Sequence, residues 1–405
     1  MKSSFGWTLL SRDALRRAET QLRDDVEGVR DEIGFLSLHQ AYADRFFPGT
    51  SVLHTRLRYV LFVPWIYGKV AEQREHKSIA DAIEGKELEL TRRLKESGEM
   101  GIIGGRNYPN PTSQPPSMIY WSALGTWRIL RSTPGGSTPS RQTVHRGLAR
   151  KPIRQQLHDD DKQLLTEEEP LFSSIPQPPP AWNDATQRLD FRLEDRERTF
   201  LRNCFLSIPR LGTDNVPSLL ASLVEQRVTL SDQITLWSPR VRAAADRSDR
   251  DALNRARQAA ALSAVGRGVY AALVEEMRAG HDGIPTEDFH RAKLDTIASV
   301  FRADALELDV DAVVTDAPTM SGGILDILRA TQSWLRTPTR SLSILYAPYA
   351  RAETRRKGQR ARLAKTPAGR ERRTEWVATE HPDASPLHYR WGNVRQLLMD
   401  LQEAP

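Results

Sequence analysis

The chain has 405 residues, of which 39% are hydrophobic and 27% are charged, and its formal net charge is +6. Cys204 is the only cysteine, which excludes an intramolecular disulfide and a multi-cysteine metal site and fits a reducing compartment. The longest apolar run, at 59–67, is far shorter than the roughly 20 residues of a membrane-spanning helix, and no signal-peptide-like run opens the chain, so we expect a cytoplasmic protein without a membrane partner.

Residues 1–131 are predicted to form a helical N-terminal domain. The apolar residues recur with helical spacing, and glycine and proline residues mark the breaks between the helices. The expected helices cover residues 11–29, 37–47, 52–73 and 81–98. Thr50 or Ser51 is expected to cap the third of them. A loop rich in Gly, Asn and Pro follows at 101–116, and an aromatic stretch follows at 117–130.

Residues 132–187 are predicted to be a linker, because they hold eight of the 25 prolines of the chain. An acidic run at 159–169 lies inside this range. Residues 188–345 are predicted to form a second helical domain. Residues 346–405 then hold a basic segment and a last helix.

The expected helices of the second half share apolar spacing and polar start signals. They cover 193–207, a stretch starting near Pro217, 251–279, 286–301, 321–335 and 393–402. Ser248 or Asp249 is expected to cap the helix at 251–279, and Thr286 the next one. The stretches 306–314 and 342–346 fit either a strand or a helix, and the fold class that we predict is mainly α.

The basic segment, residues 351–373, is the first candidate site. It holds eight Arg and two Lys against Glu353 and Glu371, a net charge of +8, whereas the whole chain carries +6. The planar guanidinium of Arg fits phosphate, so the segment is a candidate for binding a nucleic-acid backbone. A solvated tail and a site for an acidic protein are the alternatives. The candidate contacts are Arg351, Arg355, Arg356, Lys357, Arg360, Arg362, Lys365, Arg370, Arg372 and Arg373.

Two tryptophans, Trp376 and Trp391, flank the basic segment. They would either stack on bases or, as is commoner for tryptophan, pack in the core.

Arg56 and Arg58 form the second candidate site. They stand beside a dense apolar run, and the helix predicted at 52–73 can bury that run while it exposes the arginines on another face. Two interpretations stay open. In one, the arginines pair with Asp31 or Asp44 in a structural helix; in the other, the helix faces phosphates or a DNA groove.

The familiar catalytic motifs are absent from the sequence. There is no phosphate-binding loop ending in GK[ST], no HExxH, and no GxSxG elbow. Asp309, Asp311 and Asp316 are the best local candidates for the cation site of a nuclease, although solvated carboxylates are the simpler explanation. The sequence therefore predicts no catalytic residue, no metal and no cofactor.

Several strings of this sequence resemble one bacterial family. They are FGW at 5–7, FPGTS at 47–51, TRLRYVLFVPWIY at 55–67, PSMIYWSALGTWRIL at 116–130 and HYRWGNVRQLL at 388–398. In these strings the chain resembles domain-of-unknown-function family 6361. The resemblance implies no catalytic residues. It implies a gene context, because such proteins lie beside restriction and phage-defence genes, among them helicases and phospholipase D-type nucleases.

Three hypotheses for the function remain. The first is a non-catalytic subunit of a multi-component bacterial antiviral defence system. This subunit would bind DNA, which we expect to be double-stranded, or act as a scaffold. Its protein partner would be a helicase or a phospholipase D-type nuclease. The second is a metal-dependent nuclease component of such a system. The third is a toxin-like or sensor protein whose linker masks the basic segment, because the acidic run at 159–169 pairs with it and competes with DNA. A basic helical chain is equally compatible with RNA.

Overall fold

The computed structural model describes residues 31–73, 78–150, 170–184, 187–318, 320, 322–337, 341–381 and 384–403. These residues form helices and no strand, apart from isolated bridges that join Leu130 to Phe172 and Pro209 to Pro217. The mainly α fold predicted from the sequence is thus confirmed. The expected helix at 11–29 and the acidic run at 159–169 lie outside the described residues.

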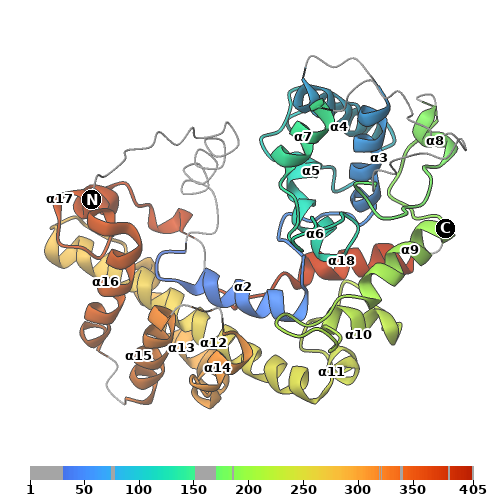
Figure 1. The fold of residues 1–405 in the computed structure, drawn as a ribbon. Helices are drawn as coiled ribbons and strands as arrows, with labels where there is room; N and C mark the ends of the chain where they lie inside the picture. Colours follow the sequence, from blue (N-terminus) through green and yellow to red (C-terminus); the bar gives the residue numbers. More distant parts are fainter. Residues whose placement is uncertain are drawn as a thin grey trace, which may run out of the picture.

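The helices gather in two groups (Figure 1). The first group contains α3 (Tyr59–Glu72), α4 (Ile79–Glu96), α5 (Pro116–Ile119), α6 (Trp121–Thr126), α7 (Arg141–Arg150) and α8 (Pro180–Asn183). The second contains α12 (Arg247–Glu276), α13 (Phe289–Glu307), α14 (Ala312–Asp316), α15 (Gly322–Arg336), α16 (Ser343–Lys357) and α17 (Pro367–Thr374). The remaining helices are α2 (Phe35–Phe46), α9 (Asp195–Leu206), α10 (Leu219–Glu225), α11 (Pro239–Ala244) and α18 (Trp391–Gln402), of which α2 and α18 lie between the groups in Figure 1.

Helix α12 is the central rod of the second group and contacts α2, α13, α15 and α16. Small residues let its neighbours come close: a Cβ at Gly266 would lie 2.3 Å from the Phe35 ring. The helix begins at Arg247, because the Asp246 carboxylate accepts a hydrogen bond from the backbone N–H of Asp249 (2.7 Å) and caps it. The predicted caps, Ser248 and Asp249, are therefore wrong and lie inside the helix.

Helix α12 thus begins four residues earlier than predicted, whereas α3 and α13 begin later. Helix α3 begins at Tyr59 rather than near 52, because tertiary partners take the backbone N–H groups before it. Tyr120 Oη accepts the N–H of Thr55, and the Asp400 carboxylate accepts that of Leu57 (3.1 and 2.7 Å).

The predicted caps of these two helices are wrong as well. The Thr50 hydroxyl donates backwards to the Phe47 carbonyl instead of capping α3. Helix α13 begins at Phe289, and the Thr286 hydroxyl donates to the Asp288 carboxylate instead. Both hydroxyls form hydrogen bonds within the loop before the helix. The presence of a residue type that often caps helices therefore did not locate the first turn.

The two stretches of uncertain type are resolved without a strand. Residues 342–346 lead into and begin α16, and residues 306–314 end α13 and begin α14. The range 132–187, expected to be a linker, contains α7 and α8, whose Val144 and Trp182 side chains are buried. The division of the chain into four units stays a prediction.

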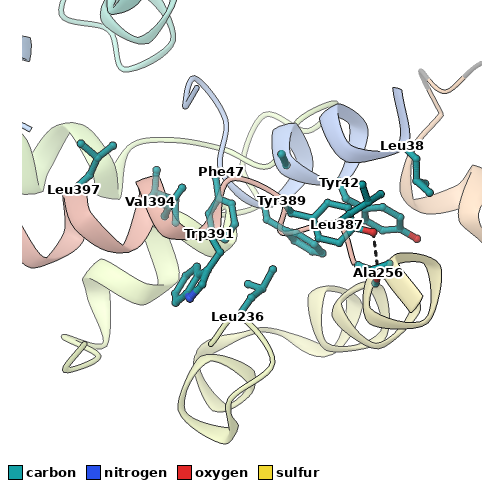
Figure 2. Close-up of a cluster of buried hydrophobic side chains, with 14 of the residues drawn as sticks. Leu38, Tyr42, Phe47, Leu236, Ala256, Leu387, Tyr389, Trp391, Val394 and Leu397 are labelled. Atoms are coloured by element: carbon teal, nitrogen blue, oxygen red, sulfur yellow. Dashed lines mark hydrogen bonds between the residues drawn. The ribbon is translucent and has the colours of Figure 1, made fainter. Parts of the chain in front are cut away.

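The C-terminal residues 387–398 run through the core (Figure 2). Leu387, Tyr389 and Trp391 are buried, and the Tyr389 hydroxyl donates to the Ala256 carbonyl of α12 (2.9 Å). The Trp391 ring lies against Phe47, and its Nε1 donates to the Ile234 carbonyl. The end of the chain therefore packs together segments from both halves of the sequence. Among the helices that the structure describes, none is long and apolar enough to cross a bilayer.

Candidate nucleic-acid interface

The basic segment is a folded part of the second helix group. It consists of the last turns of α16, a 3-10 turn (Gly358–Arg360), a short loop and α17. Ala361 and Leu363 of the loop are fully buried. A Cβ at Gly369 of α17 would lie 2.5 Å from the Ala364 carbonyl oxygen, so the helix and the loop are in close backbone contact. The segment is therefore not a solvated tail.

A buried carboxylate holds the loop from beneath. Glu353 is fully buried, and its side chain accepts hydrogen bonds from the Tyr270 hydroxyl (2.7 Å) and from the backbone N–H groups of Arg362 and Leu363 (2.9 and 2.8 Å). Because both carboxylate oxygens are used, the loop between α16 and α17 is tied to α12, which carries Tyr270.

A buried guanidinium also holds this loop in place. Arg373 is fully buried and donates to both oxygens of Asp282 (2.5 and 2.8 Å), to the Ala364 carbonyl (2.8 Å) and to the Arg362 carbonyl. The hydrogen bond from Arg373 lowers the pKa of Asp282 to about 2, so the pair stays ionised at neutral pH. Arg373 is thus a structural residue within the basic segment.

The other predicted contacts differ in their surroundings. Three of them pair with carboxylates: Arg356 with Asp31 (2.9 Å), Arg362 with Glu32 (3.1 Å) and Arg372 with Glu375 (3.0 Å). Lys357 and Arg362 are half-buried. Five are exposed and have no carboxylate within ion-pair distance among the described residues: Arg351, Arg355, Arg360, Lys365 and Arg370.

Burial also settles the role of the flanking tryptophans. Trp376 is 2% exposed and Trp391 is 6% exposed, so both pack in the core. The ring of Trp376 lies near His290 and His381, and the Arg278 guanidinium lies over it. As placed, neither ring offers a face on which a base could stack.

Arg56 and Arg58 lie before α3 and are ion-paired, but not with the predicted partners. The Arg56 guanidinium binds Asp400 (3.0 Å) and lies 3.6 Å from Glu99. Arg58 is buried and binds Asp190 and Glu197 (3.0 and 2.9 Å).

The carboxylates that the sequence suggested as partners are used elsewhere. Asp31 binds Arg356 and Asp44 binds Arg390 (2.5 Å). The prediction of these two partners is therefore wrong. Most of the partners that the structure shows lie more than a hundred residues away along the chain. Nearness in sequence therefore could not identify them.

Asp309, Asp311 and Asp316 have separate structural roles. Asp316 is buried, binds Arg255 (2.5 and 2.7 Å) and accepts from the Tyr42 hydroxyl. Asp309 accepts the backbone N–H groups of Asp311 and Ala312, and Asp311 binds Arg329. Across the described ranges, no three His, Cys, Asp or Glu side chains are grouped so that they could hold a metal ion.

Sequence reasoning missed the residues that hold the basic segment in place. Tyr270 and Asp282 lie on or just after α12, some eighty to ninety positions before their partners Glu353 and Arg373. In the sequence, Glu353 contributed only one negative charge to the basic segment. No local pattern indicated that its side chain anchors the loop.

The fold and this surface define a mainly α protein with arginines exposed on a firmly packed segment. The model of the family of unknown function DUF6361 matches residues 2–316, so the chain belongs to this family. The match covers the strings between residues 5 and 130 and ends before the basic segment and before the string at 388–398. Neither a curated protein nor a solved structure matches the chain significantly.

Proposed function

We propose that this protein is a non-catalytic subunit that binds double-stranded DNA through the phosphate backbone. The observation that carries the proposal is the set of five exposed cations of the basic segment that have no carboxylate partner within the described part of the chain: Arg351, Arg355, Arg360, Lys365 and Arg370. Arg58, Arg362 and Arg373 stay outside the proposed contact set, because their guanidinium groups already bind carboxylates inside the protein.

The anchors beneath the segment support the proposal on energetic grounds. Glu353 and Arg373 hold the loop in one conformation, so little backbone freedom is lost when a ligand binds. Arginine forks at fixed positions suit phosphate oxygens, and backbone contacts of this kind do not depend on base sequence. Buried tryptophans offer no stacking platform, which favours a duplex over unpaired strands.

The biological setting in the proposal is a multi-component antiviral defence system in bacteria. It rests on the gene context that the family resemblance implies, with a helicase or a phospholipase D-type nuclease as partner. Co-purification with the products of neighbouring genes and a plaque assay test this part. If cells that carry a variant without the exposed arginines are still protected against phage, the defence role does not depend on the basic segment.

Binding of duplex DNA across a salt series is the direct test. The variant R351Q/R355Q/R360Q/R370Q should bind more weakly, and its plot of log affinity against log salt should be less steep by about 3.6, since each lost phosphate contact contributes about 0.9. A matched control, K86Q/R92Q/R196Q/R329Q, removes four charges that already pair with Glu89, Glu96, Glu194 and Asp326. An unchanged slope in the first variant would refute the proposal, and tighter binding of duplex RNA would reassign the ligand.

The alternative, a metal-dependent nuclease, has less support. Asp316 is held by Arg255 and Tyr42, so it cannot join Asp309 and Asp311 at a cation without breaking a partly buried ion pair. Cleavage of duplex DNA by the pure protein in Mg²⁺ or Mn²⁺, lost in D309N/D311N, would favour this alternative.

A further inference from the structure

A second group of arginines lies at the other end of α12. Residues 239–250, which form α11 and the first turn of α12, contain four arginines, all exposed: Arg240, Arg242, Arg247 and Arg250. We call these four residues the α11 surface. None of them has a carboxylate within ion-pair distance among the described residues. The sequence alone did not single out this stretch, because Asp246 and Asp249 reduce its charge to +2.

The structure pairs both of those carboxylates with arginines from other segments, although only Asp249 is buried. Asp249 is 2% exposed and lies between Arg45 (3.1 Å) and Arg210 (3.0 Å). Asp246 also binds Arg210 (2.5 Å) while it caps α12. Arginines from α2 and from the loop after α9 therefore neutralise both aspartates. The four exposed arginines keep their charge, opposed in the neighbouring sequence by the exposed Asp251.

Helix α12 sets the distance between the α11 surface and the basic segment. Arg250 lies near its start, and Tyr270, which binds Glu353 of the basic segment, lies toward its end. At 1.5 Å per residue these two positions are roughly 30 Å apart along the axis, and the whole helix is roughly 45 Å long. Figure 1 shows α11 and α17 at opposite ends of this part of the molecule. One turn of B-form DNA measures about 34–36 Å, within the same range.

We propose that the α11 surface is a second phosphate-binding surface and that one DNA duplex spans it and the basic segment. This inference rests on the proposed function, since it assumes that the basic segment contacts DNA. A polyanion with evenly spaced charges suits two arginine clusters about one helical turn apart. An apolar protein partner suits them less, because no exposed large hydrophobic side chain among the described residues lies in 239–250 or 351–373.

The test compares duplexes that can and cannot reach both surfaces. The variant R240Q/R242Q/R247Q/R250Q should lose at least about tenfold in affinity for a duplex of about 24 base pairs at near-physiological salt, by loss of four phosphate contacts. For a duplex of about 8 base pairs, too short to span roughly 30 Å, the loss should be no more than about twofold. The control K86Q/R92Q/R196Q/R329Q should leave both affinities unchanged, and circular dichroism checks that each variant is folded.

The outcomes separate this inference from the proposed function. If only the basic-segment variant binds more weakly, the proposed function stands and the α11 surface is refuted. If neither four-arginine variant differs from the parent protein, both proposals are refuted. An equal loss on short and long duplexes would refute the spanning arrangement. If the protein binds poly-glutamate as tightly as DNA, the ligand is an acidic polypeptide rather than a nucleic acid. That result would overturn the assignment of the α11 surface to DNA.

Discussion

Arg351 and Arg373 belong to the same run of basic residues, yet their surroundings differ completely. Arg351 is exposed, whereas Arg373 is fully buried and binds Asp282 and two carbonyl oxygens. A buried guanidinium that loses its partners is strongly destabilising, while an exposed one adds little to stability. Residues of one type in one segment therefore divide into buried structural positions and exposed positions at which we propose contact with DNA.

Glu87 of α4 is a buried carboxyl group, and its pKa leads to a prediction about the pH dependence of stability. It is 4% exposed, accepts the Ser117 backbone N–H (2.6 Å), and burial raises its pKa to about 7. A raised carboxyl pKa means that the folded protein resists ionisation, so the stability that Glu87 contributes below pH 4.5 is lost as the pH rises toward 7. We expect E87Q, which cannot ionise, to unfold with a free energy up to about 3 kcal/mol higher than the parent at pH 8.

Urea denaturation at pH 5 and at pH 8 checks this expectation, with E84Q on the same helix as the control. Equal stabilities of E87Q and the parent at both pH values would contradict it.

At the scale of elements, the basic segment depends on the contact between α17 and the loop before it. Gly369 makes this contact possible, because any Cβ there would lie 2.5 and 2.7 Å from the carbonyl oxygens of Ala364 and Ala361. Those oxygens belong to backbone that Glu353 and Arg373 hold in place, so the helix would have to move.

The variant G369A tests whether the packed surface, rather than charge alone, binds DNA. It changes no charge, but it should lower the affinity for duplex DNA severalfold and the free energy of unfolding by about 1–3 kcal/mol, as in other overpacked contacts. The control is G85A in α4, where no atom lies within 4 Å of the added Cβ, and a gain of up to about 1 kcal/mol is expected. DNA affinity of G369A equal to that of the parent would show that a charged chain suffices.

At the scale of the molecule, the C-terminal residues join the two helix groups. Asp400 of α18 is 3% exposed and accepts hydrogen bonds from the Arg56 guanidinium and the Leu57 backbone N–H. Arg390, just before α18, binds Asp44 and the Thr50 carbonyl. The chain end thus contacts the entry to α3, the C-terminal part of α2 and, through Tyr389, helix α12.

We therefore expect D400A to destabilise the whole protein. Removal of this buried carboxylate leaves the partly exposed Arg56 and the Leu57 N–H without their main partner, a loss of up to about 3–5 kcal/mol. D232A is the control, because Asp232 binds Arg395 of the same helix at an exposed position and should matter by less than about 1 kcal/mol. Thermal unfolding followed by circular dichroism measures both; similar melting temperatures would mean that the chain end does not hold the groups together.

Local patterns were enough to predict the mainly α class and several of the described helices, such as α9, α15 and α18, within a few residues, whereas α7, α8, α11 and α17 were not predicted. Helix periodicity and breaking residues act over one or two turns, so they can be recognised in the sequence. The clustering of charge in residues 351–373 was visible for the same reason.

Tertiary structure alone decided which charges are available to a ligand. Arg58 and Arg373 became internal, Asp246 and Asp249 were paired with Arg210, and the start of α3 moved to Tyr59, because partners from distant segments bind these groups. A charged group pairs with whatever the fold brings within a few ångströms, and desolvation makes that pairing decisive. The surface on which the proposed function rests is therefore a property of the folded molecule, not of the charge count of the sequence.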